Sequence, residues 1–137
     1  MRVQGQVALE GIANPAGVSV RFTLQQGSQQ ETVNLTLGAG GSYAFDTALA
    51  GAATVRVSTP NGVWLCTQRS ATLSDLTTLN FALKAGDANQ DGAIDDADLL
   101  LVLFAFGSSD PQADMNRDGT VDDADLLTVL FNFGIGC

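Results

Sequence analysis

The sequence predicts an α+β protein that is mainly β. An antiparallel seven-stranded β-sandwich is expected over residues 1–84, followed by a small pair of loop–helix units over residues 85–137. Hydrophobic and polar residues alternate with a period of two through the first part, which is typical of strands with one buried face. Two similar acidic loops occur in the second part, each followed by an apolar run of helical length. The net charge is +1 before Ala85 and −10 from Ala85 onward, which places the boundary near Lys84–Gly86.

The predicted strands are short and are separated by Gly, Pro and Asn turns. This organisation is typical of an antiparallel β-sandwich. A lone tryptophan in such a run, Trp64, is expected in the core. The seven runs are Val3–Leu9, Val18–Leu24, Val33–Leu37, Tyr43–Phe45, Val55–Val57, Val63–Cys66 and Leu79–Leu83.

Three motifs in this region occur in a recognisable order. They are GQVALEG, then NPAGVSVRF, then GGSYAFD, with a G-x-V, a P-x-G-V-x-V and a G-x-Y-x-F pattern in turn. The order resembles the carboxypeptidase regulatory-like, or transthyretin-like, sandwich over Val3–Leu83. That resemblance implies a non-catalytic spacer, adhesion or assembly module.

The two acidic loops are DANQDGAIDDAD from Asp87 and DMNRDGTVDDAD from Asp114, and they start 27 residues apart. Carboxylate or amide oxygens fall at the first, third, fifth, ninth and twelfth places, and the seventh place offers its backbone carbonyl. Glycine at the sixth place, Gly92 or Gly119, permits the sharp turn around an ion. Ca²⁺ prefers this kind of all-oxygen ligand set. The sequence therefore predicts two Ca²⁺ ions, one in each loop.

The repeat continues beyond the loops, and 15 of the 21 positions in Asp87–Gly107 and Asp114–Gly134 are identical. No helix is expected before either loop, because Ala85-Gly86 precedes the first and a segment containing Pro111 precedes the second. Tandem loop–helix units with Asp at the twelfth place resemble the dockerin module, over about Gly86–Cys137. The resemblance implies as calcium ligands Asp87, Asn89, Asp91, Asp95 and Asp98, then Asp114, Asn116, Asp118, Asp122 and Asp125, with the carbonyls of Ala93 and Thr120 at the seventh places.

Dockerins bind a cohesin, which is a β-sandwich, through the helices that follow the loops. Family members commonly present hydroxyl residues at the helix start and a basic residue nearby. Here the helix starts are Asp96-Ala97 and Asp123-Ala124, and neither helix carries a base. The resemblance thus implies calcium binding, while the chemistry of the partner contact departs from the common pattern.

The two helices differ at Leu101 against Thr128 and at Ala105 against Asn132. In each helix the two positions are four residues apart and share one stripe. The polar stripe of the second helix is expected to face water. The apolar stripe of the first, Leu101 and Ala105, is expected to contact a β-surface, either in this chain or in another molecule.

The chain has two cysteines, Cys66 and Cys137. A buried free thiol is the simplest interpretation of Cys66 in its apolar run. In an extracellular setting a Cys66–Cys137 disulfide is favoured, and an intermolecular bond through Cys137 is the alternative.

Several function classes are disfavoured by composition. The acidic net charge of −9 argues against nucleic-acid binding. The absence of histidine excludes the common Ser–His and Cys–His mechanisms, and the carboxylates outside the loops share no motif, so an enzyme is not expected. The longest apolar run, Leu99–Phe106, is too short to cross a bilayer, and the first residues read as a strand rather than a signal peptide.

Two functions remain open. In the first, the protein is a calcium-stabilised structural subunit, extracellular or at a bacterial cell surface, that joins head to tail with copies of itself through the dockerin-like module and the β-sandwich. In the second, it is a cellulosome-type dockerin appendage that binds a cohesin scaffold. The first is preferred at this point, because the chain has no enzyme domain to serve as cargo.

Overall fold

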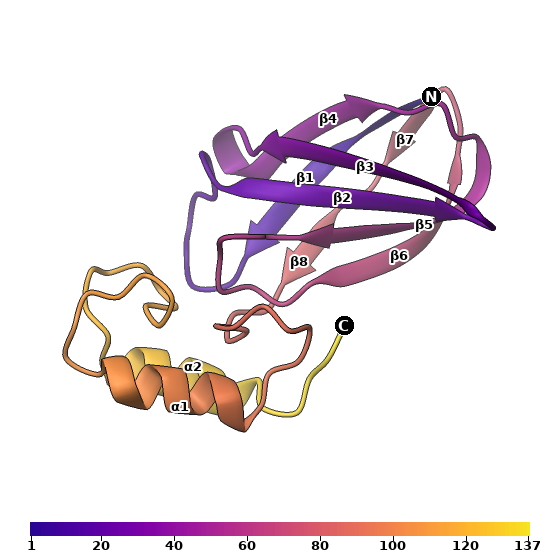
Figure 1. Ribbon diagram of the computed structural model, residues 1–137. Coiled ribbons are helices and arrows are strands. Elements are labelled where there is room, and N and C mark those ends of the chain that lie inside the picture. Colours follow the sequence, from indigo (N-terminus) through magenta and orange to yellow (C-terminus); the bar gives the residue numbers. More distant parts are fainter.

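In the computed structural model, which describes all residues 1–137, a two-sheet β-sandwich stands above a pair of short helices (Figure 1). The protein is mainly β, as predicted. None of its helices is long and apolar enough to span a membrane. The elements are β1 (Arg2–Leu9), β2 (Ser19–Gln26), β3 (Gln29–Thr36), the 3₁₀ turn η1 (Ala39–Gly41), β4 (Ser42–Asp46), β5 (Gly51–Ser58), β6 (Thr67–Leu73), β7 (Leu76–Thr78), β8 (Phe81–Leu83), α1 (Asp96–Ala105) and α2 (Asp123–Phe131).

The two sheets each contain four strands. One has the order β3-β2-β5-β6 and is antiparallel throughout. In the other, β1 pairs antiparallel with β4, whereas β7 and β8 both run parallel to β1. The prediction of a purely antiparallel sandwich is therefore wrong for this sheet, because the chain crosses over after β6 and then adds β7 and β8 alongside β1 in the same direction as β1.

The strand count also differs from the seven predicted. Val63–Cys66 is buried but forms only an isolated bridge, between Trp64 and Ala85. A strand follows it instead, β6, in which only Leu73 is buried, so period-two alternation did not reveal it. β7 and β8 are separated at Leu79 and Asn80, opposite Gly5. A Cβ atom on Gly5 would lie 1.9 Å from the Leu79 carbonyl oxygen, so the strands approach closely only because this residue is glycine.

The hydrophobic core is continuous through both parts of the chain. In the sandwich it is built around the rings of Phe22, Tyr43, Phe45 and Phe81. In the loop–helix part it includes one residue from the middle of each helix, Val102 and Val129, which are fully buried. The same cluster contains Trp64 and residues from both acidic loops, so the loop–helix part packs on the end of the sandwich rather than hanging from a linker.

Candidate metal centres and their surroundings

Three carboxylates from each acidic loop converge. One oxygen each from Asp87, Asp91 and Asp98 lies within 4.8 Å of the others, and Asp114, Asp118 and Asp125 repeat this arrangement in the second loop. In both clusters the first and twelfth residues of the loop are buried and the fifth is exposed. The structure thus brings together the first, fifth and twelfth places of the predicted ligand set.

The loop backbone folds so that its amide groups support these carboxylates. The Gly92 amide donates to Asp87 Oδ2 over 3.1 Å, and the Gly119 amide donates to Asp114 Oδ2 over 2.8 Å. Both glycines have φ near +90°, which side-chain-bearing residues rarely adopt, so glycine is needed at the sixth place. This tight turn points the first carboxylate back across the loop.

The remaining predicted ligand positions have clear local roles. The third residues, Asn89 and Asn116, accept through Oδ1 from the amide of the fifth residue of their loop. The ninth residues, Asp95 and Asp122, cap the N-termini of α1 and α2 by accepting from the amide two residues on. Their carboxylates face the helix start, a position from which ninth-place residues of such loops often reach the ion through water. Ala93 and Thr120, at the seventh places, have amides that donate to the fifth-place aspartates, at 3.0 Å each.

The twelfth residues connect the loops to the helices. Asp98 Oδ2 accepts from the Asp95 amide over 2.9 Å, and its Oδ1 accepts from the Asn89 amide over 3.1 Å. Asp125 makes the equivalent bonds, which complete a capping box in each helix. A residue that closes the loop and starts the helix couples the geometry of the cluster to the orientation of the helix.

The electrostatics of both clusters suit a cation. Burial, followed by the charges of Asp98 and Asp91, raises the pKa of Asp87 to about 6. Burial also raises the pKa values of Asp98 and Asp125, against the opposing effect of their backbone hydrogen bonds. Asp114 Oδ1 is buried with no hydrogen-bond partner. A divalent ion would supply the missing partner and relieve the repulsion, so these residues fit a bound hard cation.

The fourth residue of each loop contacts the same sandwich segment. Gln90 Nε2 donates to the carbonyls of Gly62 and Trp64, over 2.7 and 3.1 Å. In the second loop, the guanidinium of Arg117 stacks over the Trp64 ring at 4.9 Å from its centroid. Both loop residues have φ of +57°. Trp64 is fully buried, as expected for a core residue, but it lies at the junction between the two parts of the chain.

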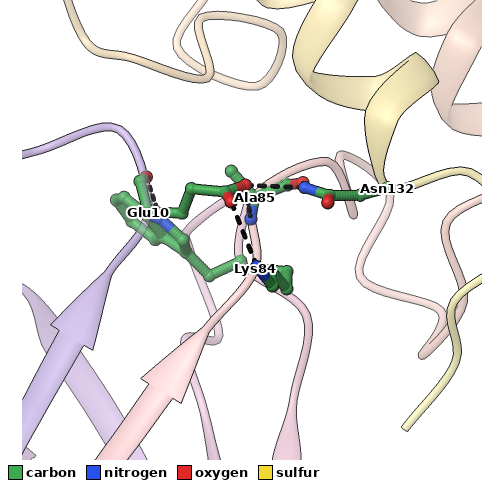
Figure 2. Close-up of polar contacts among 5 residues, drawn as sticks. Glu10, Lys84, Ala85 and Asn132 are labelled. Carbon is green, nitrogen blue, oxygen red and sulfur yellow. Dashed lines mark hydrogen bonds and ion pairs between the residues drawn. The ribbon is translucent and has the colours of Figure 1, made fainter.

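Glu10 lies at the centre of a second set of junction contacts (Figure 2). Its Oε1 accepts from Asn132 Nδ2 over 2.6 Å and from the Ala85 amide over 3.2 Å, and its Oε2 lies 3.6 Å from Lys84 Nζ. Asn132 Nδ2 also donates to the Ala85 carbonyl over 2.7 Å. The Trp64 indole donates to the Glu10 carbonyl over 3.0 Å. These contacts join the end of α2 to the sandwich.

The position of Asn132 corrects the expectation that the polar stripe of α2 faces water. Asn132 is only 6% exposed. Its side-chain amide donates to Glu10 Oε1 and the Ala85 carbonyl at the junction instead of to water. In α1, Leu101 is 38% exposed and Ala105 is half-buried against the core. Contact of Leu101 and Ala105 with another molecule stays a prediction.

The two cysteines form the Cys66–Cys137 disulfide, with a Cα–Cα distance of 5.5 Å. This confirms the favoured intramolecular disulfide over the intermolecular alternative, and neither cysteine is a free thiol in the folded chain. The disulfide joins the sandwich to the segment that follows α2, 71 residues along the chain.

Both α1 and α2 expose large apolar side chains, together called here the helix face, and the two repeats contribute the same number of residues to it. Phe104 and Phe131 are 85% and 82% exposed, which is unusual for phenylalanine in a folded protein. The other four members show matched exposures of 48–49%. The helix face consists of Leu100, Leu103 and Phe104 from α1 and Leu127, Leu130 and Phe131 from α2.

Comparison with known proteins gives structural matches only. No family model matches the sequence, and no curated protein does. One match is a chain in the crystal structure of a C-terminal interface mutant of a type II cohesin–X-dockerin complex from Acetivibrio cellulolyticus. It is 23% identical and aligns over 99% of this chain and 97% of that chain, with a TM-score of 0.74. An N-terminal interface mutant of the same complex gives the same identity and coverage and a TM-score of 0.75. A DUF3823 family protein from Parabacteroides merdae aligns over 62% of this chain and 46% of that chain at a TM-score of 0.46.

The first two matches establish the fold of the whole chain, sandwich and helices together. The junction residues Glu10, Gln90 and Asn132 were not identified from the sequence. The one signal available for Asn132 was its difference from Ala105 in an otherwise similar repeat. Nothing in the sequence distinguishes Glu10 from the other scattered carboxylates.

Proposed function

We propose that this chain is a non-enzymatic, calcium-stabilised protein-interaction unit of the dockerin type, which binds a cohesin-like β-sandwich through the helix face. The observation that carries the proposal is the helix face itself, with Phe104 and Phe131 almost fully exposed. Monomeric proteins rarely leave so many large apolar side chains uncovered on two neighbouring helices, whereas protein interfaces use aromatic anchors of this kind.

The structural matches support this choice of partner. They come from complexes of a cohesin with an X-dockerin, and the alignment spans nearly the whole of both chains. An alignment that runs through a β-sandwich and a loop–helix pair favours the dockerin-bearing chain as the counterpart, since a cohesin is a sandwich alone. The cohesin-binding function is therefore preferred over head-to-tail self-association, for which no comparable support exists.

Calcium fits this function because the helices begin inside the metal loops. Asp98 and Asp125 each belong to a carboxylate cluster and to a helix cap. Binding one Ca²⁺ in each loop would fix the direction of both helices and hold the two halves of the helix face in register. Removing the ions would leave mutually repelling carboxylates at both helix starts.

The chemistry of the helix face indicates what the partner presents. Neither helix offers a base, and Thr128 is the single hydroxyl residue within them. The matching surface on the partner should accordingly be apolar, with shallow pockets for two aromatic rings. Full burial of each ring would contribute about 1.5–3 kcal/mol. The disulfide is consistent with an oxidising, extracellular or cell-surface location.

The test is binding of the purified chain to a panel of recombinant cohesins by calorimetry and size-exclusion chromatography. Binding of at least one cohesin is expected in calcium and should be lost in chelator. Replacing Phe104 and Phe131 by serine should abolish it. Leu76→Ser is the matched control, because Leu76 is a 57% exposed hydrophobic residue on β7, away from the helices.

The same experiment separates the two functions. If no cohesin binds, and the chain alone forms calcium-dependent oligomers that the double serine variant abolishes, the partner is another copy. If the double variant binds a cohesin as well as the wild type does, the helix face is not the binding surface.

A further inference from the structure

The two calcium loops receive the same backbone support from different parts of the chain. In the second loop, Gly107 N donates to Val121 O and Val121 N donates to Ser108 O, over 2.8 Å each. In the first loop, Gly134 N donates to Ile94 O over 2.8 Å, and Ile94 N donates to Ile135 O over 2.9 Å. Each loop is thus backed by the segment that follows the helix of the other repeat.

The two supporting segments are anchored differently. Gly107–Ser108 lies between α1 and the second loop, so the backbone itself holds it on both sides. The segment 134–137 is held on one side by α2 and on the other by the Cys66–Cys137 disulfide. The guanidinium of Arg56 donates to both sulfur atoms, over 3.0 and 3.1 Å, and so supports this anchor from β5.

The disulfide lies directly against the first metal loop. The Cys137 amide donates to the Gly92 carbonyl over 3.0 Å, and Gly136 forms a β-bridge with Ala93. A Cβ atom placed on Gly92 would lie 3.5 Å from Cys137 Sγ. Gly92 forms the turn of the loop, and the Ala93 carbonyl is the proposed seventh-place ligand. Cys137 therefore holds the part of the loop that must be fixed for the ion to be coordinated.

We propose that the Cys66–Cys137 disulfide is a positioning element for the first calcium site alone. By anchoring segment 134–137 it fixes the backbone at Gly92 and Ala93, while the second site keeps its own support. This inference rests on the proposed calcium sites. Loss of a contact that orients metal ligands typically lowers metal affinity by about 10- to 100-fold. By reciprocity, calcium at the first site should make the disulfide harder to reduce.

The test measures each site separately. Asp118→Ala removes an exposed ligand of the second site and leaves the first, and Asp91→Ala does the converse. Cys66→Ser with Cys137→Ser is then introduced into each background, and calcium affinity is measured by calorimetry. The expected result is a loss of about 10- to 100-fold at the first site and less than about twofold at the second. An equal loss at both sites, a loss at the second alone, or no loss at either overturns the proposal.

Reduction of the folded wild-type chain provides a second route if the serine variant does not fold. A dithiol such as dithiothreitol passes two electrons and two protons to the disulfide, which yields two cysteine thiols and the cyclic disulfide of the reagent. Titration with this couple should show a more easily reduced disulfide in chelator than in calcium. An oxidised chain that binds no calcium refutes the proposed sites themselves. A chain that binds two ions with unchanged affinity after reduction refutes only the coupling.

Discussion

Replacing Asn132 by alanine tests the junction between the sandwich and the loop–helix part. The substitution copies Ala105 of the first repeat and removes two hydrogen bonds, to Glu10 Oε1 at 2.6 Å and to the Ala85 carbonyl at 2.7 Å. A hydrogen bond to a charged acceptor contributes about 1.5–3 kcal/mol and one to a neutral carbonyl about 0.5–1.5 kcal/mol. The side chain of Glu10 is 37% exposed, so solvent screening places the first value at its lower end.

The expected loss is about 2–3 kcal/mol in the free energy of unfolding, or a fall of about 6–12 °C in the melting temperature for a chain of this size. Calorimetric melts in saturating calcium measure it. Thr128→Ala is the control, because Thr128 Oγ1 donates only to Ala124 O in its own helix, and its effect should stay within about 0.5 kcal/mol. Equal melting temperatures for the two variants would show that the Asn132 contacts contribute nothing to stability.

Three further outcomes follow from the metal loops and the helices. Calorimetry should count two calcium ions, and Asp98→Ala should weaken only the first site. Calcium should also raise the melting temperature, and a melting curve insensitive to calcium would contradict calcium binding at these sites. In chelator, the free energy of unfolding should rise as the pH falls from about 7.5 to about 5, because the raised pKa of Asp87, about 6, makes the folded chain bind more protons than the unfolded chain in this range. In calcium the dependence should reverse, since protons then compete with the ion; parallel pH profiles in the two conditions would refute the coupling. Leu101→Thr with Ala105→Asn copies the second repeat, and both calcium sites should be kept. Leu101 is 38% exposed, so its replacement should weaken partner binding, whereas Ala105 is half-buried against the core, so its replacement by Asn should lower the melting temperature. Unchanged binding would remove these two residues from the interface.

The parts of the fold that the sequence predicts well are those dictated by local chemistry. The alternation in β2 places Val20, Phe22 and Leu24 in the core, because one face of that strand is buried and the other faces solvent. The acidic loops and the helix starts follow from carboxylate spacing and capping, which involve residues close in the chain. The spacing predicts the first, fifth and twelfth places of each loop as ligands, and these places do converge in the structure.

The features that sequence analysis missed depend on contacts between distant residues. β6 carries few apolar residues, with only Leu73 buried, and its pairing with β5 rather than its own pattern holds it in the sheet. The parallel course of β7 and β8 reflects how the chain crosses between sheets, which strand patterns do not encode. The burial of Asn132 depends on Glu10, which is 122 positions away in the chain.

Comparing the two repeats with the structure separates the roles of their residues. The positions that are identical include the carboxylate clusters and the six residues of the helix face, whose exposures also match. Of the six positions that differ, three contact the sandwich. Gln90 and Arg117 both reach the segment around Trp64, and Asn132 reaches Glu10 where Ala105 has no equivalent partner. The third differing pair is Ala88 and Met115. The backbone at Met115 lies so close to Gly11 of the sandwich that a Cβ atom added there would be 3.2 Å from the Met115 carbonyl oxygen.

This division has a physical cause. A module built from two similar halves meets the single, asymmetric end of a sandwich, so the halves must differ wherever they touch it. They are free to remain alike at the carboxylate clusters and on the outward sides of the helices. The equal exposure of Phe104 and Phe131 then means that docking on the sandwich covers neither half of the helix face. The sandwich fixes the module in place and leaves its full apolar surface available for a partner.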